Sequence, residues 1–157
     1  MRFIGNKESI VEEIESFINS KIMSDDRLVL FDAFCGTGSV SDRLKNRFNV
    51  VINDNLKWAT IYTADRLYAP TCHFERLGFD PFDYLNQSCN KIQGFIYKTY
   101  APTESDRMYF TPENAARIDY FRNQIEQWYI SKLLTESEYM FLLACLIESV
   151  SKVSNTA

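Results

Sequence analysis

The sequence lacks the residue patterns of a metal site or a disulfide framework. It has a single histidine, His73, and four cysteines at positions 35, 72, 89 and 145, with no Cys-x-x-Cys pair among them. His73 has no metal-ligand partner at a recognisable spacing. We therefore expect reduced thiols and no bound metal ion.

Long apolar runs and an excess of basic charge are also missing. No stretch approaches the roughly 20 apolar residues of a membrane-spanning helix, and the N-terminus lacks the apolar core of a signal peptide. These absences predict a cytoplasmic protein without a membrane partner. The net charge of −4 at pH 7 argues against a pure DNA-binding module, because such modules carry a basic face. It allows an enzyme whose DNA contacts are local.

The most specific pattern lies within residues 28–54. It begins with an apolar run that indicates a buried parallel strand. A Gly-x-Gly turn follows at residues 36–38, and a helix is expected over residues 40–48. A second apolar run at residues 50–52 leads to Asp54. A strand, glycine turn, helix, strand and acid in this order predict the opening of a Rossmann-like α/β fold.

Glycines and an acid in these places suit an adenosine-bearing cofactor. Gly36 and Gly38 have no Cβ, so the backbone can turn sharply and a ligand can lie against it. The start of the following helix presents unpaired N–H groups to a ligand. Asp54, at the tip of the second strand, can accept hydrogen bonds from both ribose hydroxyls. The alternative is an ordinary strand–helix turn that contains two glycines.

The residues of the turn distinguish between cofactors. Ser41 stands where a dinucleotide fingerprint has its third glycine, and the Gly-Lys-Ser/Thr of a P-loop is absent. Asp32, Phe34, Gly36 and Gly38 instead form an acid-x-Phe-x-Gly-x-Gly loop. This loop resembles the S-adenosylmethionine loop of DNA methyltransferases.

Helical periodicity is present on both sides of this unit. One helix is expected from Lys7 or Glu8 to residue 21, and another over residues 55–68. A lysine at the head of a helix opposes the helix dipole. Lys7 is therefore either a solvated side chain or one directed at a carboxylate or a substrate.

Residues 71–157 are expected to form a mostly helical second segment after residues 1–70. A short helix is expected over residues 83–91, and a longer one begins at the Thr111-Pro112 cap and runs to about residue 130. A capping box at residues 135–138 opens the last helix. That helix is apolar on nearly every side, which predicts a central, buried position.

An irregular aromatic stretch is expected over residues 92–110. Its aromatic side chains alternate with cations, including Lys98 and Arg107. Such a mixture can stack on bases and bind phosphates, and Lys98 and Arg107 are the candidate DNA contacts. We favour the alternative, a loop whose aromatics pack over a core, because Glu104 and Asp106 dilute the positive charge.

Three motifs in order resemble the N-terminal half of D12-class (Dam-like) adenine-specific DNA methyltransferases. They are Arg2-Phe3-Ile4-Gly5-Asn6-Lys7, Asp32-Ala33-Phe34-Cys35-Gly36-Thr37-Gly38 and Asn53-Asp54-Asn55. Residues 109–114 and 154–157 are similar to the segment that precedes the family's catalytic loop. The resemblance covers essentially the whole chain, although Ala33 replaces the proline that is usual in the family.

This resemblance implies methyl transfer from S-adenosylmethionine to adenine N6 in double-stranded DNA, as in restriction-modification systems. It implies that Phe3 and Lys7 line the cofactor pocket and that Asp54 holds the ribose. Asp32 would bind the methionine ammonium, directly or through water, while Gly36 and Gly38 let the backbone approach the methionine. For Phe34, packing beneath the loop is favoured over direct contact with the cofactor.

The family's catalytic Asp/Asn-Pro-Pro-Tyr/Phe loop is missing. Asp80-Pro81 is followed by Phe82-Asp83, and no apolar strand precedes it. Two strands also fall short of the roughly five or more in a Rossmann-like sheet. We therefore expect no catalytic residue in this chain, which would be a fragment that binds cofactor without turnover and needs a C-terminal half.

Alternatives to this reading remain open. The chain could be a non-catalytic or complementing subunit of a split methyltransferase, or a degenerate remnant. A small-molecule or RNA methyltransferase is disfavoured by the leading Gly-x-Lys motif, because that element belongs to the adenine-DNA pattern.

Overall fold

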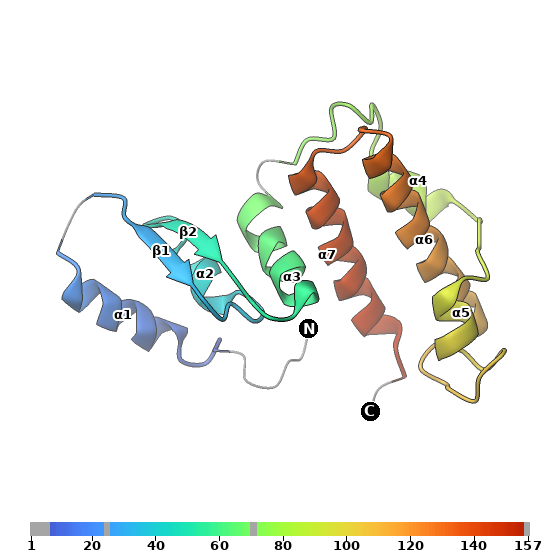
Figure 1. Ribbon diagram of the computed structural model, residues 1–157, viewed down its shortest axis with the longest axis horizontal. Coiled ribbons are helices and arrows are strands. Elements are labelled where there is room, and N and C mark those ends of the chain that lie inside the picture. The colour runs from blue at the N-terminus through green and yellow to red at the C-terminus, as the bar shows by residue number, and fades with distance from the viewer. Residues whose placement is uncertain (1–6, 24–25, 70–71, 156–157) are drawn as a thin grey trace. The chain divides into compact units, whose positions relative to one another are not determined.

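The computed structural model describes residues 7–23, 26–69 and 72–155. The chain divides into two compact units, Met1–Pro70 and Thr71–Ala157, which Figure 1 shows in blue to green and in green to red. Among the described residues, no helix combines the length and apolar character needed to cross a bilayer.

The first unit is a small α/β structure. Its elements are α1 (Val11–Lys21), β1 (Val29–Asp32), α2 (Ser39–Leu44), β2 (Asn49–Ile52) and α3 (Lys57–Tyr68). The two strands pair in parallel, with Val29 opposite Asn49 and Asp32 opposite Ile52. A parallel pair needs a crossover connection, which α2 supplies. The predicted strand–helix–strand order is confirmed.

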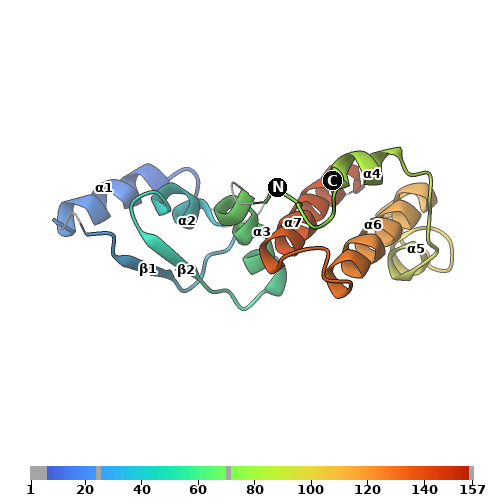
Figure 2. The ribbon, with the colours of Figure 1, turned by 90° about the horizontal axis from the view of Figure 1, so that it is seen from above.

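The sheet is less buried than the sequence predicts. Val29, Phe31 and Val51 share one face, on which Phe31 is 61% exposed. Figure 2 shows α1 and α2 on the same side of the two strands. Helices normally cover both faces of a parallel sheet, and within the described part of this unit they cover one. The prediction of fully buried strands is therefore wrong for the open face.

The helices of the first unit are shorter than expected. α1 begins at Val11, and a turn precedes it in which the Ile10 N–H donates to the Lys7 carbonyl. α2 ends at Leu44, whose carbonyl accepts the N–H groups of Arg47 and Phe48 in a closing turn. Lys7 thus precedes the first helix and does not form its head.

The second unit is helical. It contains α4 (Pro81–Gln87), α5 (Phe95–Tyr100), α6 (Pro112–Ile130) and α7 (Glu136–Val153). α6 and α7 lie side by side in Figure 1. Their buried core is built from large apolar side chains, namely Leu77, Leu85, Tyr120, Ile125, Trp128, Leu134 and Leu142.

Local caps explain where the two long helices begin. The Thr111 hydroxyl accepts the Asn114 N–H at the start of α6. Thr135 and Glu138 form the predicted capping box of α7, and the buried Glu138 carboxylate also accepts the Phe74 N–H at 2.6 Å. Both predicted starts are confirmed, and Glu138 in addition ties residue 74 to the head of α7.

Three expectations for this unit are wrong. α7 is not a central buried helix, because only Glu138, Leu142 and Ala144 are buried along it. The short helix starts at Pro81 instead of residue 83, because the Asp80 carboxylate caps it by accepting the N–H groups of the next two non-proline residues. Residues 92–110 are not wholly irregular, since they contain α5.

Candidate cofactor site

The loop between β1 and α2 needs glycine at two positions. Gly36 has φ +52° and Gly38 has φ +78°, a left-handed region that side-chain-bearing residues rarely adopt. A Cβ on Gly36 would meet nothing within 4 Å, whereas one on Gly38 would lie 2.7 Å from Cγ2 of Thr63. The loop therefore has open space over Gly36 and is closely packed against α3 at Gly38.

Asp54 joins the tip of β2 to this loop. One carboxylate oxygen accepts the Gly36 N–H at 2.9 Å and the other accepts the Leu56 N–H at 2.9 Å. The hydrogen bonds from Leu56 and Gly36 lower the pKa of Asp54, and the positive charge of Lys7 adds to this effect. Asp54 is therefore ionised at neutral pH, with the cation of Lys7 nearby.

Asp54 also has a structural role. The sequence analysis assigns its carboxylate to the ribose alone, yet the same carboxylate holds two segments of backbone together. Each carboxylate oxygen can accept more than one hydrogen bond. Asp54 thus keeps acceptor capacity for a ligand while it shapes the loop.

Asp32 anchors the start of α2. Its carboxylate accepts the Ser41 hydroxyl at 2.6 Å, and Ser41 is fully buried. The serine that replaces the third glycine of a dinucleotide fingerprint therefore ties α2 to the end of β1. This structural role of Ser41 is not predicted from the sequence, where the residue only argues against a dinucleotide site.

Three further residues belong to the predicted pocket: Phe34, Lys7 and Phe3. Phe34 is 77% exposed, so the expectation that it packs beneath the loop is wrong. The ring is therefore accessible to a ligand. Lys7 is exposed and precedes α1. Phe3 lies outside the described residues.

Sequence reasoning missed Thr63, which supports the loop from α3. Thr63 is fully buried, and its hydroxyl donates to the Gly36 carbonyl at 3.0 Å. The available signal was weak: Thr63 follows Ala59 by one helical turn and so shares a buried helix face.

The Cys35 thiol beside Gly36 is buried. Burial raises the pKa of Cys35, a hydrogen bond with the Thr63 side chain opposes this rise, and the negative charges of Asp32 and Asp54 add to it. Because the thiolate is the nucleophile, a raised pKa lowers the reactivity of Cys35.

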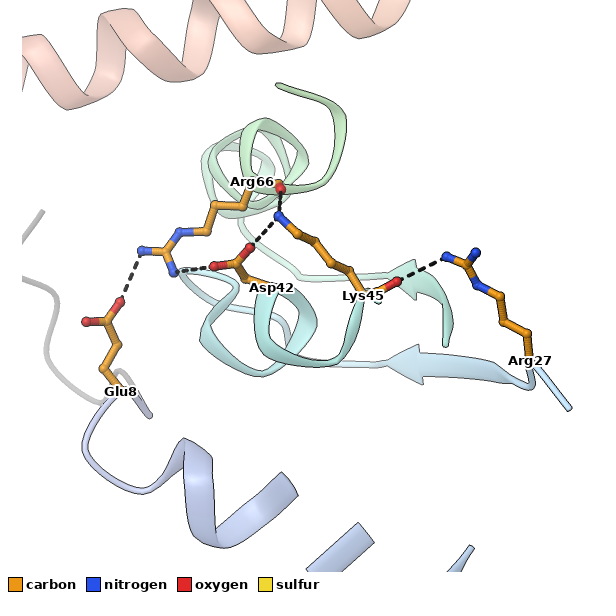
Figure 3. Close-up of polar contacts among 5 residues, drawn as sticks. All are labelled: Glu8, Arg27, Asp42, Lys45 and Arg66. Carbon is orange, nitrogen blue, oxygen red and sulfur yellow. Dashed lines mark hydrogen bonds and ion pairs between the residues drawn. The ribbon is translucent and has the colours of Figure 1, made fainter. Parts of the chain in front are cut away.

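A chain of ion pairs holds the helices around the loop (Figure 3). Arg66 of α3 lies 3.1 Å from Glu8 and 3.7 Å from Asp42, and Lys45 lies 2.8 Å from Asp42. Lys45 also donates to the Arg66 carbonyl at 2.6 Å, and Arg27 donates to the Lys45 carbonyl. These contacts connect α2, α3 and the segment that carries Lys7.

The loop has features that fit an adenosine-bearing cofactor. It offers open space at Gly36, an ionised acceptor at Asp54 and an exposed aromatic ring at Phe34. Among the described residues, Ser39 Oγ is the single buried side-chain polar atom without a hydrogen-bond partner. No group of three or more potential metal ligands occurs in the described ranges.

The candidate DNA contacts, Lys98 and Arg107, both belong to the second unit. Lys98 Nζ is 3.6 Å from a Glu104 oxygen, and the Arg107 guanidinium lies 5.3 Å from the centre of the Tyr100 ring. Phe95 is 59% exposed and Tyr109 is 45% exposed. The favoured packing interpretation therefore fails for these two rings, which solvent reaches.

Other aromatic side chains of the same stretch do pack inward. Phe110 is buried with Ala101, Ala115 and Ile118, and Tyr97 and Tyr100 pack against this cluster. The stretch thus combines a buried side with an exposed aromatic and cationic side. Neither interpretation of the sequence describes all of it.

A buried acid that the sequence analysis missed explains α5. Asp119 of α6 is 7% exposed and accepts the N–H groups of Ile96 and Tyr97 at 3.1 and 2.8 Å. A Cβ on Gly94 would lie 2.7 Å from the Asp119 carboxyl carbon. α5 is capped from another helix, so no local sequence signal marks its start.

The family model of D12 class N6 adenine-specific DNA methyltransferases matches residues 3–157. The chain belongs to this family. The resemblance inferred from the three motifs is confirmed. No solved structure matches this D12 chain significantly.

Relatives of this D12 chain are longer. Modification methylase LlaI of Lactococcus lactis subsp. lactis is 35% identical over all of the chain, which covers 26% of that protein. Type II methyltransferase M.FokI of Planomicrobium okeanokoites is 34% identical over 99% of the chain and 25% of its own length. Type II methyltransferase M.NlaIII of Neisseria lactamica is 34% identical over all of the chain, which covers 47% of that protein. The chain thus spans about a quarter to a half of these relatives.

Proposed function

We propose that this chain is the cofactor-binding part of a site-specific DNA adenine N6-methyltransferase of the restriction-modification type. S-adenosylmethionine would lie over the Gly36–Gly38 loop of a Rossmann-like domain that further strands complete. Family membership and relatives named as modification methylases support the reaction. The observation that carries the site is the Asp54 carboxylate bonded to a glycine loop with open space above Gly36.

Each residue has a role in this proposal. Asp54 accepts the ribose hydroxyls with its remaining acceptor capacity, and Asp32 binds the methionine ammonium with the acceptor capacity that Ser41 leaves. Gly36 and Gly38 let the backbone approach the methionine. Phe34 contacts the cofactor directly, which its exposure supports. Lys7 and Phe3 line the edge of the pocket.

The proposal assigns no catalytic residue to this chain. When bound, S-adenosylmethionine supplies an activated methyl group, so the protein contributes proximity and orientation. The Asp-Pro-Pro-Tyr-like loop that would orient the adenine is absent from the sequence, and Asp80 caps α4. We propose that residues outside this chain supply that loop, either from a longer polypeptide or from a complementing subunit.

The second unit contributes DNA contacts in this proposal. Arg107 and Lys98 would bind phosphates, and the exposed rings of Phe95 and Tyr109 would stack on unpaired bases. The local arrangement favours this role, because cations and exposed aromatics gather on the surface of α5 and of the segment that follows it. The competing acid is Glu104, which the phosphate would have to displace from Lys98.

Calorimetric titration with S-adenosylmethionine tests the cofactor site. We expect saturable binding by the chain, none by Asp54→Ala and reduced binding by Asp54→Asn, which keeps one acceptor oxygen. Asp106→Ala, an exposed acid in the second unit, is the matched control and should bind normally. Equal affinity of the chain and Asp54→Ala would refute the ribose assignment, and absence of binding by the chain itself would refute the proposal.

A further inference from the structure

We infer that Thr63 is a positioning residue for the cofactor: through two contacts, α3 sets the backbone orientation of the glycine loop. This inference rests on the proposed function, because it concerns the same loop. Thr63 lies in the middle of α3, and none of the three motifs that resemble the D12 family contains it.

The hydroxyl makes the first contact. Thr63 Oγ1 donates to the Gly36 carbonyl at 3.0 Å in a fully buried position. The N–H of Gly36 donates to the Asp54 carboxylate at 2.9 Å. Both polar groups of this residue are therefore engaged, although its Cα faces open space.

A fixed carbonyl also fixes the next N–H. In a trans peptide the C=O and the following N–H point in opposite directions. Because the Gly36 carbonyl points toward Thr63, the Thr37 N–H points away from α3. Thr63 thereby fixes the direction of this donor within the loop.

The rest of the side chain makes the second contact. The position of a Cβ on Gly38 would be 2.7 Å from Cγ2 and 2.8 Å from Oγ1 of Thr63. Gly38 has φ +78°, and its N–H closes the loop on the Cys35 carbonyl at 2.8 Å. The Thr63 side chain thus packs directly on the turn that leads into α2.

Ion pairs and a hydrogen bond hold α3 in place close to Thr63. Arg66 follows Thr63 by about one helical turn and is paired with Asp42 of α2 and with Glu8. Lys45 of α2 bonds the Arg66 carbonyl. α3, which carries Thr63, is therefore anchored to α2, the helix that follows the glycine loop.

Amide hydrogen exchange of the ligand-free chain tests the positioning directly. Thr63→Val removes the hydroxyl and leaves the Gly36 carbonyl without its donor. We expect exchange at the Gly36 and Gly38 amides to become about tenfold faster, the consequence of one lost buried hydrogen bond, while β2 amides remain unchanged. Thr63→Ser loses Cγ2 but keeps the hydroxyl, which bonds the Gly36 carbonyl and also lies 2.8 Å from the Cβ position of Gly38, so most of the protection should remain.

Thr60→Val is the matched control. Thr60 lies on the same helix, and its hydroxyl bonds only to the Lys57 carbonyl of its own turn among the hydrogen bonds of the described residues. Its removal should leave the loop amides unchanged. If Thr63→Val does not fold, as judged by circular dichroism, the smaller Thr63→Ala variant takes its place.

Titration of the same variants with S-adenosylmethionine completes the test. We expect about tenfold weaker binding for Thr63→Val and near-normal binding for Thr63→Ser and Thr60→Val. Unchanged loop exchange in Thr63→Val would overturn the inference, as would altered exchange with unaltered affinity. Altered exchange in a chain that never binds the cofactor would support the positioning of the loop and refute the proposed function.

Discussion

Each unit holds a buried polar side chain of a later helix against a glycine of an earlier segment. In the first unit Thr63 lies against Gly38, and in the second Asp119 lies against Gly94. Gly38 has φ +78°, whereas Gly94 has φ −91°, which any residue can adopt. Glycine is therefore needed for both backbone and space in the first unit, and for space alone in the second.

The two polar groups also differ in charge and in what they hold. Thr63 is neutral, and its hydroxyl donates one hydrogen bond to a loop carbonyl. Asp119 is a buried carboxylate that accepts two N–H groups at the start of a helix. Hydrogen bonds to charged groups are stronger than those between neutral groups. The comparison predicts that the second unit depends more on its buried polar side chain than the first.

Removing the Asp119 carboxylate should have the largest effect. Asp119→Ala leaves the N–H groups of Ile96 and Tyr97 without their acceptor, and we expect a loss of about 2–4 kcal/mol in the free energy of unfolding. Urea denaturation of the chain measures it. Asp106→Ala, which removes an exposed acid, should change stability by less than about 0.5 kcal/mol. An equal effect of the two substitutions would contradict the capping of α5 by Asp119.

Gly38→Ala should have the second-largest effect on stability. It combines a strained φ with a collision against Thr63, and we expect a loss of about 2–3 kcal/mol in urea denaturation. Gly36→Ala is the control, because its φ is also positive but its Cβ meets open space, so about 1–2 kcal/mol is expected. If Gly38→Ala loses no more stability than Gly36→Ala, then Thr63 does not limit the space beside Gly38.

Glu138→Gln should have a smaller, pH-dependent effect. Burial raises the pKa of Glu138, but hydrogen bonds from Thr135 and Phe74 outweigh it, and the net pKa is lowered. The carboxylate therefore stabilises the fold above its unfolded pKa of about 4.5, and this contribution is lost as pH falls through the lower folded pKa. We expect Glu138→Gln to cost about 1–2 kcal/mol at pH 7 and to flatten the acid limb of the stability curve.

Denaturation of the chain and of Glu138→Gln at pH 3 to 7 measures this difference. Glu136→Gln changes an exposed acid in the same first turn of α7 and should leave the acid limb as it is. A parallel loss of stability in the chain and in Glu138→Gln below pH 4.5 would contradict the assignment.

Arg107→Ala should have the smallest effect, which is measured on DNA binding. We expect about threefold to tenfold weaker binding of double-stranded DNA and a salt dependence reduced by about one phosphate contact. Arg76→Ala, an exposed arginine elsewhere in the same unit, is the control. Fluorescence anisotropy at several salt concentrations measures both, and equal slopes for the chain and Arg107→Ala would remove Arg107 from the proposed contacts.

Predictions from the sequence succeeded where the deciding residues are neighbours. Thr111-Pro112 and the Thr135–Glu138 capping box mark the starts of α6 and α7, because each cap bonds to the helix it begins. α5 has no such cap, since its acceptor, Asp119, lies on another helix. That is the physical reason why the start of α5 could not be predicted from the sequence.

The candidate site divides in the same way. Gly36, Gly38 and Asp54 could be identified in the sequence, because a turn with positive φ and an acid after a strand are local features. The support that Thr63 gives to Gly36 could not be identified, because it depends on how α3 packs. The exposure of Phe34 was likewise mispredicted, because burial depends on which neighbours are present.

The sequence by itself therefore determined the order of the elements apart from α5, the parallel strand pair, the glycine turn and the D12 family. Those features depend on short-range sterics, local hydrogen bonds and periodicity. Only the tertiary structure decided that Asp54 closes the loop, that Thr63 and Asp119 lie against glycines, and that one face of the sheet stays open. Such contacts join residues far apart in the chain, and chain neighbours carry no information about them.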